Sequence, residues 1–517
     1  MKPAERQRTE GALFTDQYQL TMAQLYFEQG LHERQAQFDY TFRTYPDYGR
    51  HQAGYCVLSG LEWLLDWMQQ TRFVAADIDP LRKQRAASGA PLFDAGFLEW
   101  LEAHGHFGAL TMDAVPEGRV VHAYAPVVTV TGPLAMAQIL ETSLLNHLNY
   151  QTLIATKASR VVESARDGKV LEFGMRRGPA SGTNAGTYAA LVGGVDFSSN
   201  VGLSHAVGLP PRGTHAHSMV QVFMALGLGE LEAFRAFAAR YPDDAILLVD
   251  TIDTLQSGVP NAITVFDELR SRGHVPGGIR LDSGDLAYLA IRSAQMLNAA
   301  GHGDVSIVLS SNLDELAIWQ ILSQIEQEAA RYDVDPDALI ARLVYGVGTR
   351  LVSSQGHAAL DGVYKLVAVA EDGGWAPAIK ISETREKIPI PGRKQLWRVY
   401  DRRGYATADA VACEGEVIDG AAGATLHHPY RTGVRRWLGP GEMAEVEPLL
   451  QRVWRSGRTL PERSIEHARE WRRRDLDRLD RGVRRLVNPH IYHVSLTDEM
   501  AALRDRLIAA TAGDAVS

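Results

Sequence analysis

The chain has 517 residues, of which 45% are hydrophobic and 22% charged, and its net charge is −9. This composition predicts a soluble globular protein of about three domains, and the acidic balance argues against general binding to nucleic acid or acidic membranes. Cys56 and Cys413 are the only cysteines, which excludes a disulfide framework and CxxC metal sites and favours a reducing cytoplasm. We expect no signal peptide, since no apolar run follows MKPAERQRTE, and no membrane-spanning segment.

The first part of the chain mixes helical and strand-like patterns. Residues 60–70 have apolar side chains at helical spacing, and residues 38–46 alternate apolar and polar side chains as a half-buried strand does. Residues 119–133 are predicted to form paired strands. The long helical periodicity of residues 133–166 predicts one buried helix or two in succession.

A repeated unit follows, in which a short apolar run ends in a polar, glycine-rich cluster and a helical stretch usually comes next. Such runs are typical of parallel strands covered on both faces. We therefore predict an α/β fold with an irregular (β/α) barrel, which we favour over an open doubly wound sheet. The runs are 169–178, 193–200, 245–253, 278–285, 305–312, 342–349 and 362–369, and polar residues at their ends include Glu172, Arg176, Asp250, Arg280, Asp282, Asp285, Ser311, Asn312 and Thr349.

Three regions are predicted: an N-terminal α/β domain at 1–132, a (β/α) barrel catalytic domain at 133–370, and a smaller C-terminal region at 371–517 that packs on the N-terminal domain. An arginine-dense helix is predicted within 461–486. Its acid–arginine pairs at i,i+4 spacing favour a solvated helix over a surface for nucleic acid.

The sequence GTHAHS at 213–218 precedes a strongly helical run. Free backbone N–H groups and the helix dipole favour an anion at such a helix start. A histidine there can accept a phosphoryl group or act as an acid or base beside a phosphate. For a single histidine, a purely structural role is the alternative, and zinc binding is disfavoured because a third ligand at a usual spacing is absent.

Three further clusters suit an anionic, phosphorylated ligand. RLDSGD at 280–285 combines a guanidinium fork for a carboxylate or phosphate with two carboxylates for Mg²⁺ or ribose hydroxyls; the alternative is a turn with capping aspartates. YGVGTR at 345–350 offers backbone N–H groups, and EFGMRRG at 172–178 places an acid and two arginines at one strand end. The absence of GxxxxGK[ST], HExxH and GxSxG argues against a P-loop ATPase, a zincin and an α/β-hydrolase.

In this order the clusters resemble the nicotinate phosphoribosyltransferase family. The similarity begins with TDQYQLTMAQLY at 15–26, continues through KISETREKIPIPGRKQLWR at 380–398 and PHIYHVSLTDEM at 489–500, and covers residues 11–505. It implies an irregular, incomplete barrel beside an α/β domain. The implied reaction joins nicotinate to 5-phosphoribosyl 1-diphosphate, giving nicotinate mononucleotide and diphosphate. It also implies Mg²⁺, ATP as a co-substrate hydrolysed through a phosphohistidine, and a cytoplasmic homodimer in NAD salvage, with no nucleic-acid or membrane partner.

The resemblance also implies roles for individual residues. His215 stands where the family usually has an apolar residue, and Met175 where it more often has threonine. The implied roles are phosphorylation for His217, proximity to nicotinate and phosphate for Thr214, contact with the nicotinate carboxylate or ring for Arg280, ring stacking from a neighbouring subunit for Tyr18, binding of the ribose 5-phosphate for Gly346, Gly348 and Thr349, a phosphate contact for Arg176, and ribose or Mg²⁺ for Asp282.

The base could also differ within this fold. A nicotinamide enzyme is expected to have an aspartate near FSSN, whereas this chain has Ser199 and Asn200, which favours nicotinate. Nicotinamide or quinolinate phosphoribosyl transfer is the first alternative. A sugar-phosphate aldolase or isomerase is the second. It would need a buried Schiff-base lysine or a carboxylate base; Lys365 and Lys380 lie on or near strands, but no adjacent acid–base set distinguishes either of them. A non-catalytic nucleotide-binding regulator is the third.

Overall fold

The computed structural model describes residues 9–382, 384–461 and 463–514, which form two compact units. Unit 1 comprises the chain up to residue 153 and from residue 359 onward, and unit 2 comprises residues 154–358. The sequence-based prediction places boundaries after residues 132 and 370 instead. MKPAERQRTE, where we expect no signal peptide, lies outside the described residues except for its last two positions.

Unit 2 contains a sheet of six parallel strands in the order β7-β6-β11-β10-β9-β8. Each strand pairs with the next along the chain and the last pairs with the first, as in a barrel, except that β7 and β8 are the two ends of the sheet. The predicted irregular (β/α) barrel is thus confirmed, as a barrel with an open seam. The strands are β6 Lys169–Glu172, β7 Phe197–Ser198, β8 Ile246–Leu248, β9 Gly278–Leu281, β10 Ser306–Ser310 and β11 Leu343–Val347.

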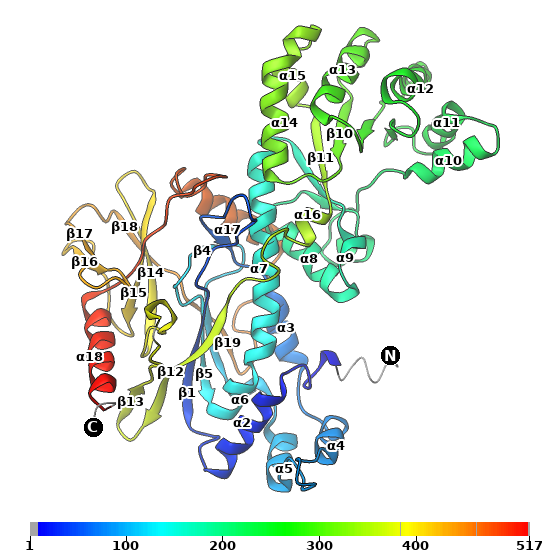
Figure 1. Cartoon of the computed structure of the whole chain (residues 1–517). Helices are drawn as coiled ribbons and strands as arrows, with labels where there is room; N and C mark the ends of the chain where they lie inside the picture. Colours follow the sequence, from blue (N-terminus) through cyan, green and yellow to red (C-terminus); the bar gives the residue numbers. More distant parts are fainter. Residues whose placement is uncertain (1–8, 383, 462, 515–517) are drawn as a thin grey trace. The chain divides into compact units, whose positions relative to one another are not determined.

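Helices cover these strands, and α13 and α14 lie together beside β10 (Figure 1). Ile307, Val308 and Leu309 of β10 are fully buried, which explains why the strands are continuous apolar runs. The helices are α8 Ala180–Val192, α9 Val201–Ala206, α10 His217–Ala225, α11 Glu230–Arg240, α12 Val259–Ser271, α13 Leu286–Ala299, α14 Glu315–Glu328, α15 Pro336–Ile340 and α16 Thr349–Val352, with a 3-10 helix at Met175–Arg177 and a π-helix at Thr254–Gly258.

Some polar residues at the strand ends begin helices. The Asp285 side chain accepts a hydrogen bond from the backbone N–H of Tyr288 (3.1 Å) at the start of α13. The Asp314 side chain accepts one from Ala317 (2.9 Å) at the start of α14. Asp285 therefore has the capping role that was the alternative for an aspartate of RLDSGD.

Unit 1 contains two six-stranded sheets, one antiparallel with order β13-β12-β1-β5-β3-β19 and one mixed with order β17-β16-β20-β15-β14-β18. Helix α7, Glu141–Ser164, begins in this unit and ends in unit 2. The strands are β1 Gln35–Thr41, β2 Cys56–Val57, β3 Thr111–Ala114, β4 Val120–Val121, β5 Val128–Pro133, β12 Val363–Glu371, β13 Gly374–Pro377, β14 Lys394–Tyr400, β15 Ala406–Cys413, β16 Ala424–His427, β17 Arg435–Leu438, β18 Glu445–Pro448, β19 Gln451–Arg455 and β20 Val494–Leu496, and the helices are α2 Gln17–Glu28, α3 Leu61–Gln70, α4 Ala75–Lys83, α5 Ala95–His104, α6 Leu134–Ile139, α17 Ile465–Asp477 and α18 Asp498–Asp514.

Two strand predictions are wrong in their pairing. Residues 362–369 were expected to add a parallel strand to the barrel, but β12 pairs antiparallel with β1 in unit 1. Within 119–133, β4 pairs with β2, and β5 pairs with β1 and β3, so the two strands do not pair with each other. An apolar run indicates burial on a sheet and leaves the partner strand open.

The arginine-rich helix α17 is partly buried, contrary to the expected solvated helix. Arg472 and Asp475 are 6% and 3% exposed. The carboxylate of Asp475 accepts hydrogen bonds from Arg119 (2.7 Å) and Arg398 (3.3 Å), and all three side chains are buried. The helix is therefore tied to residues from the N-terminal and C-terminal parts of unit 1, which the spacing of charges within 461–486 does not reveal.

A buried carboxyl group makes the stability of unit 1 depend on pH. Glu117 accepts hydrogen bonds from the backbone N–H groups of Gly60 (2.6 Å) and Glu62 (3.1 Å), and burial raises its pKa to about 7. Because the pKa is higher in the folded chain than the ordinary 4.5, Glu117 contributes stability below pH 4.5, and this is lost as the pH rises through 7. The loss should reach about 3 kcal/mol, at about 1.4 kcal/mol per pKa unit.

We therefore expect the free energy of unfolding of Glu117→Gln to fall less than that of the wild type between pH 5 and pH 8, because the variant has no carboxyl group to ionise. Urea unfolding at both pH values measures the difference. Glu102→Gln, at an exposed position of α5, is the matched control and should keep the wild-type dependence. Equal losses in wild type and Glu117→Gln would contradict the prediction.

Candidate active site

Polar side chains gather at the carboxyl ends of the parallel strands in unit 2, the end at which (β/α) barrels place their active sites. Arg280 is the last residue but one of β9, and it donates hydrogen bonds to Ser310, at the end of β10, and to Asp282. The backbone N–H of Asp282 donates to the carboxylate of Asp250, which follows β8 (3.0 Å). These four residues, from three neighbouring strands, form one hydrogen-bonded cluster.

Arg280 is held by three hydrogen bonds in three directions. It donates from Nε to Ser310 Oγ (2.8 Å) and from its two terminal nitrogens to Thr214 Oγ1 (2.9 Å) and Asp282 Oδ1 (2.9 Å). Its side chain is 12% exposed, and its guanidinium lies 5.4 Å from the centre of the Phe173 ring. A guanidinium fixed in this way has a set direction for a planar anion, such as a carboxylate.

His217 is the first residue of α10, as expected of a histidine at a helix start. Its Nδ1 is 3.0 Å from Thr251 Oγ1, so Nε2 is the nitrogen left for chemistry. Nε2 lies 3.8 Å from Asp250 Oδ1 and 3.9 Å from Asp282 Oδ2, and the side chain is 38% exposed. The imidazole is thus accessible to a reactant and flanked by two carboxylates.

Asp250 has a more central position than the sequence indicated. Its side chain is 2% exposed, and Oδ2 accepts hydrogen bonds from the Asp282 N–H (3.0 Å) and the Ser283 hydroxyl (2.6 Å). Oδ1 has no hydrogen-bond partner within the described part of the chain and faces His217. The sequence alone assigns no role to Asp250, and the available signal is a carboxylate directly after the buried run AILLV.

Asp250 and Asp282 also fit a hard divalent cation. Each directs one carboxylate oxygen, Oδ1 of Asp250 and Oδ2 of Asp282, toward the same imidazole nitrogen, and oxygen ligands are those Mg²⁺ prefers. Cys413, Glu416 and Glu499 form another possible metal group, in unit 1. Glu416 already accepts hydrogen bonds there from the Cys413 N–H (2.9 Å) and the Thr497 hydroxyl (2.8 Å).

Glu172, at the end of β6, organises the adjacent strand end. It is fully buried and accepts hydrogen bonds from the hydroxyls of Thr187 (3.1 Å) and Ser198 (2.6 Å) and from the Gly174 N–H. Three groups from three segments thus meet at one carboxylate. Its role here is to fix the backbone at the ends of β6 and β7.

In the FSSN segment, the Asn200 side chain is held by hydrogen bonds within the fold, and the Ser199 side chain is more available to a ligand. Asn200 is 1% exposed; its amide donates to Asn184 (2.9 Å), and its oxygen caps α9 by accepting from the Leu203 N–H (3.2 Å). Ser199 is half-buried, and its backbone N–H donates to the Glu172 carbonyl oxygen (3.0 Å). The contacts given for Asn200 use its side chain, whereas the contact given for Ser199 uses its backbone. Of the two side chains, that of Ser199 is therefore the one more available to a ligand.

The glycines after β11 stand beside Phe173. A Cβ on Gly346 would lie 2.5 Å from the Phe173 ring, and one on Gly348 would lie 3.3 Å from the Phe173 carbonyl oxygen. Close packing therefore explains Gly346 without a ligand. Thr349 begins α16. Arg176 lies in the 3-10 helix after β6 and has an exposed side chain, and this 3-10 helix packs against α16. The structure thus brings Arg176, Gly348 and Thr349 to neighbouring strand ends.

Tyr18 lies in unit 1, on helix α2, and 49% of its surface is exposed. Its hydroxyl has a raised pKa, chiefly because of partial burial and then because of Glu141. Its expected role, stacking on a ring bound by another subunit, stays a prediction.

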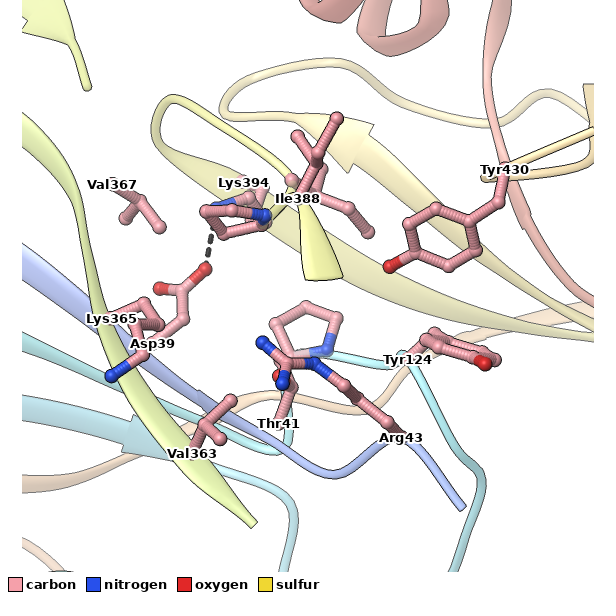
Figure 2. Close-up of a pocket in the computed structure, with 13 residues that line it drawn as sticks. Asp39, Thr41, Arg43, Tyr124, Val363, Lys365, Val367, Ile388, Lys394 and Tyr430 are labelled. Carbon is pink, nitrogen blue, oxygen red and sulfur yellow. Dashed lines mark hydrogen bonds and ion pairs between the residues drawn. The ribbon is translucent and has the colours of Figure 1, made fainter. Parts of the chain in front are cut away.

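Unit 1 also contains a small cavity, of about 20 Å³, between β1, β12 and the 388–394 segment (Figure 2). Asp39 and Lys394 form a buried ion pair in it, and burial lowers the pKa of Lys394 while Asp39 opposes this. Arg43 and Lys365 also line the cavity. Lys365 is 38% exposed and 3.8 Å from Glu141, so it lacks the burial expected of the Schiff-base lysine of an aldolase.

No helix in the described part of the chain is long and apolar enough to cross a membrane. Family models match almost the whole chain. Residues 13–149 match the nicotinate phosphoribosyltransferase N-terminal domain, residues 168–388 the nicotinate phosphoribosyltransferase family, and residues 393–504 the nicotinate phosphoribosyltransferase C-terminal domain.

Characterised relatives agree with these matches. Nicotinate phosphoribosyltransferase from Bacillus subtilis is 37% identical over 83% of this chain and 81% of its own length, and the Caenorhabditis elegans protein of that name is 33% identical over 94% and 92%. The crystal structure of human nicotinic acid phosphoribosyltransferase superposes with a TM-score of 0.76, covering 95% of this chain and 99% of that one at 30% identity. Nicotinate-nucleotide pyrophosphorylase from Pyrococcus furiosus, at 20% identity and a TM-score of 0.65, shares the fold.

Proposed function

The chain belongs to the nicotinate phosphoribosyltransferase family and has its role in NAD biosynthesis, and we propose that it couples ATP hydrolysis, through phosphorylation of His217, to the joining of nicotinate and 5-phosphoribosyl 1-diphosphate. The predicted family is confirmed. The aldolase, isomerase and regulator alternatives are not retained.

The observation that most directly supports the phosphohistidine is the setting of His217 Nε2. In the tautomer that donates Nδ1–H to Thr251 Oγ1, the Nε2 lone pair is available to attack the terminal phosphorus of ATP. The bond to ADP breaks as the N–P bond forms, and ADP leaves with the electron pair. Loss of the phosphoryl group to water later returns His217 to its first state.

Mg²⁺ is the expected partner of this step. A phosphoryl group on Nε2 would stand within about 4 Å of the Asp250 and Asp282 carboxylates, and like charges this close repel strongly in a protein interior. Asp250 Oδ1 and Asp282 Oδ2 are the atoms that would hold the cation. When bound, Mg²⁺ neutralises phosphate charge at this site and assists departure of diphosphate.

Arg280 suits the carboxylate of nicotinate. Its three hydrogen bonds orient the guanidinium, and Phe173 gives the neighbouring space an aromatic wall. Bond formation passes through a ribosyl cation-like state, in which the pyridine nitrogen bonds to the ribosyl carbon as the bond to diphosphate breaks. Orientation and charge must do most of the catalytic work, because the cluster has no side chain placed as a ribosyl nucleophile.

The choice of base is supported by the ends of β6 and β7. The Asn200 side chain binds Asn184 and caps α9, so it is not available to the base. Ser199 is then the residue of this segment that can face the base, and its side chain is uncharged. A neutral side chain there does not repel a carboxylate, whereas an aspartate would. Phosphates of 5-phosphoribosyl 1-diphosphate are assigned to Arg176, Gly346, Gly348 and Thr349 as an extension of the family resemblance.

A homodimer and a cytoplasmic location belong to the same proposal. Tyr18 of one subunit would then stack on the base bound by the other. Its exposure on α2 is compatible with a contact outside its own subunit.

Product formation from labelled nicotinate and 5-phosphoribosyl 1-diphosphate, with and without Mg-ATP and beside nicotinamide as a competing base, tests the proposal. Faster formation of nicotinate mononucleotide with ATP, and no amide product, is expected. Equal rates with and without ATP would contradict the coupling, and product from nicotinamide would contradict the choice of base.

A further inference from the structure

The seam of the unit 2 barrel is crossed by a segment of the chain, residues 212–215. On one side, the Arg212 N–H donates to the carbonyl oxygen of Ser198 at the end of β7 (2.9 Å). On the other side, the Leu248 N–H of β8 donates to Nε2 of His215 (3.1 Å). The segment therefore stands where a strand between β7 and β8 would pair.

The contact with His215 gives a hydrogen-bond acceptor to the Leu248 N–H, which does not pair with another strand of the sheet. Successive N–H groups of a strand point to opposite sides, and the Val249 N–H donates to the carbonyl oxygen of Arg280 on β9 (3.1 Å). The Leu248 N–H accordingly points into the seam, in a residue that is 1% exposed. Buried N–H groups are almost always paired. The only partner of this one in the contacts of the described residues is the His215 imidazole.

The same contact defines the tautomer of His215. Because Nε2 accepts a hydrogen bond, it is unprotonated, and the ring proton is on Nδ1, 3.4 Å from the Ala216 carbonyl oxygen. His215 is 8% exposed, and its ring packs against Phe237 of α11 with centroids 4.9 Å apart. The ring is thus a fixed, neutral acceptor.

We propose that His215 is a positioning residue, whose neutral imidazole fastens the segment before α10 to β8 and so places the groups on either side of it. Thr214, directly before it, accepts a hydrogen bond from Arg280 (2.9 Å). His217, two residues after it, meets Thr251 at 3.0 Å. This inference rests on the proposed function, in which His217 accepts the phosphoryl group and Arg280 binds the base.

Protonation of His215 would release the segment, because an Nε2–H would point at the Leu248 N–H. Burial is the main cause that lowers the pKa of His215, and the Ala216 carbonyl oxygen opposes it. The charged or titratable groups that face His215, Arg280 on β9 and His217 on α10, lower the pKa further, while α11 contributes aromatic rings. The anchor therefore holds at neutral pH and is lost in acid.

Two substitutions distinguish the effect of the hydrogen-bond acceptor of His215 from the effect of the space that its ring fills. His215→Gln keeps an acceptor oxygen near the place of Nε2 but cannot be protonated, and His215→Leu fills the space without an acceptor. We expect His215→Leu to lower kcat by about 10- to 100-fold, as a displacement of about 1 Å at a reacting group does. The KM for 5-phosphoribosyl 1-diphosphate should change by less than about threefold, because its assigned contacts lie on other strands. His215→Gln should keep kcat within about threefold of the wild-type value. In its pH profile, the part of the fall in kcat at low pH that is caused by protonation of His215 should be absent.

The measurements are kcat and KM between pH 5 and pH 8.5, and acid-labile labelling from terminally labelled ATP. Normal labelling of the wild type with equal kcat for the Leu and Gln variants overturns the inference and leaves the proposed function standing. Absence of labelling in the wild type overturns the proposed phosphohistidine and this inference with it. If His215→Leu does not fold, the pH profile of His215→Gln decides, and an unchanged acid limb overturns the inference.

Discussion

Replacing His217 with asparagine is expected to abolish the stimulation of nucleotide synthesis by ATP and to lower kcat/KM in the presence of ATP by about 100-fold, within the range for losing a group that acts in the chemical step. Asparagine can keep the contact with Thr251, now at 3.0 Å, but has no nucleophilic nitrogen at the place of Nε2. The flanking carboxylates of Asp250 and Asp282 then have no phosphoryl acceptor between them.

Rates with and without Mg-ATP, together with labelling from terminally labelled ATP, measure this effect. His205→Asn is the matched control, since it changes an exposed histidine of α9 in the same unit and should behave as the wild type. Undiminished ATP stimulation in His217→Asn would exclude His217 as the phosphoryl acceptor. Loss of labelling with the ATP-independent rate retained would separate the coupling from the transfer step.

Replacing Arg280 with lysine is expected to lower kcat/KM for nicotinate by about 100- to 1000-fold. Lysine cannot donate to Ser310, Thr214 and Asp282 at once, and two lost charge-assisted hydrogen bonds correspond to about 3–4 kcal/mol. Most of the effect should be on the KM for nicotinate, because the fork that faces a carboxylate is lost. The KM for 5-phosphoribosyl 1-diphosphate should change little.

Steady-state kinetics with each substrate varied in turn tests this split. Arg235→Lys is the control, because Arg235 also binds carboxylates, Glu232 and Glu268, but on the partly exposed faces of α11 and α12. Exposed ion pairs of that kind contribute little, so its kinetics should stay close to those of the wild type. A wild-type KM for nicotinate in Arg280→Lys would show that another group binds the carboxylate.

The strands of the barrel were predictable because each is a short apolar run whose position depends on local sequence. Residues 305–312, for example, contain the three fully buried side chains of β10, and parallel strands covered on both faces require such runs. Residues 362–369 have the same pattern, yet β12 belongs to the other unit. Apolar character records burial, and the partner strand depends on contacts with β1, more than 300 residues earlier in the chain.

The helix start at His217 was also predictable, since GTHAHS and the helical run after it are adjacent in sequence. The environment of His217 was not. Asp250 and Thr251 come from the loop after β8 and Asp282 from the loop after β9, and only the parallel arrangement of these strands brings them to one imidazole. Asp285, from the same RLDSGD motif as Asp282, caps α13 instead, and the motif itself does not distinguish the two aspartates.

The sequence by itself determined the fold class, the family and the segments that form the strand ends, because these follow from local patterns and from motifs in a fixed order. Only the tertiary structure decided that His215 closes the barrel seam, that Asp250 faces His217, and that Asp475 of α17 is buried between Arg119 and Arg398. The physical reason is the same in each case. Hydrogen bonds and ion pairs between segments depend on distances of a few ångström in space, which the separation of residues along the chain does not specify.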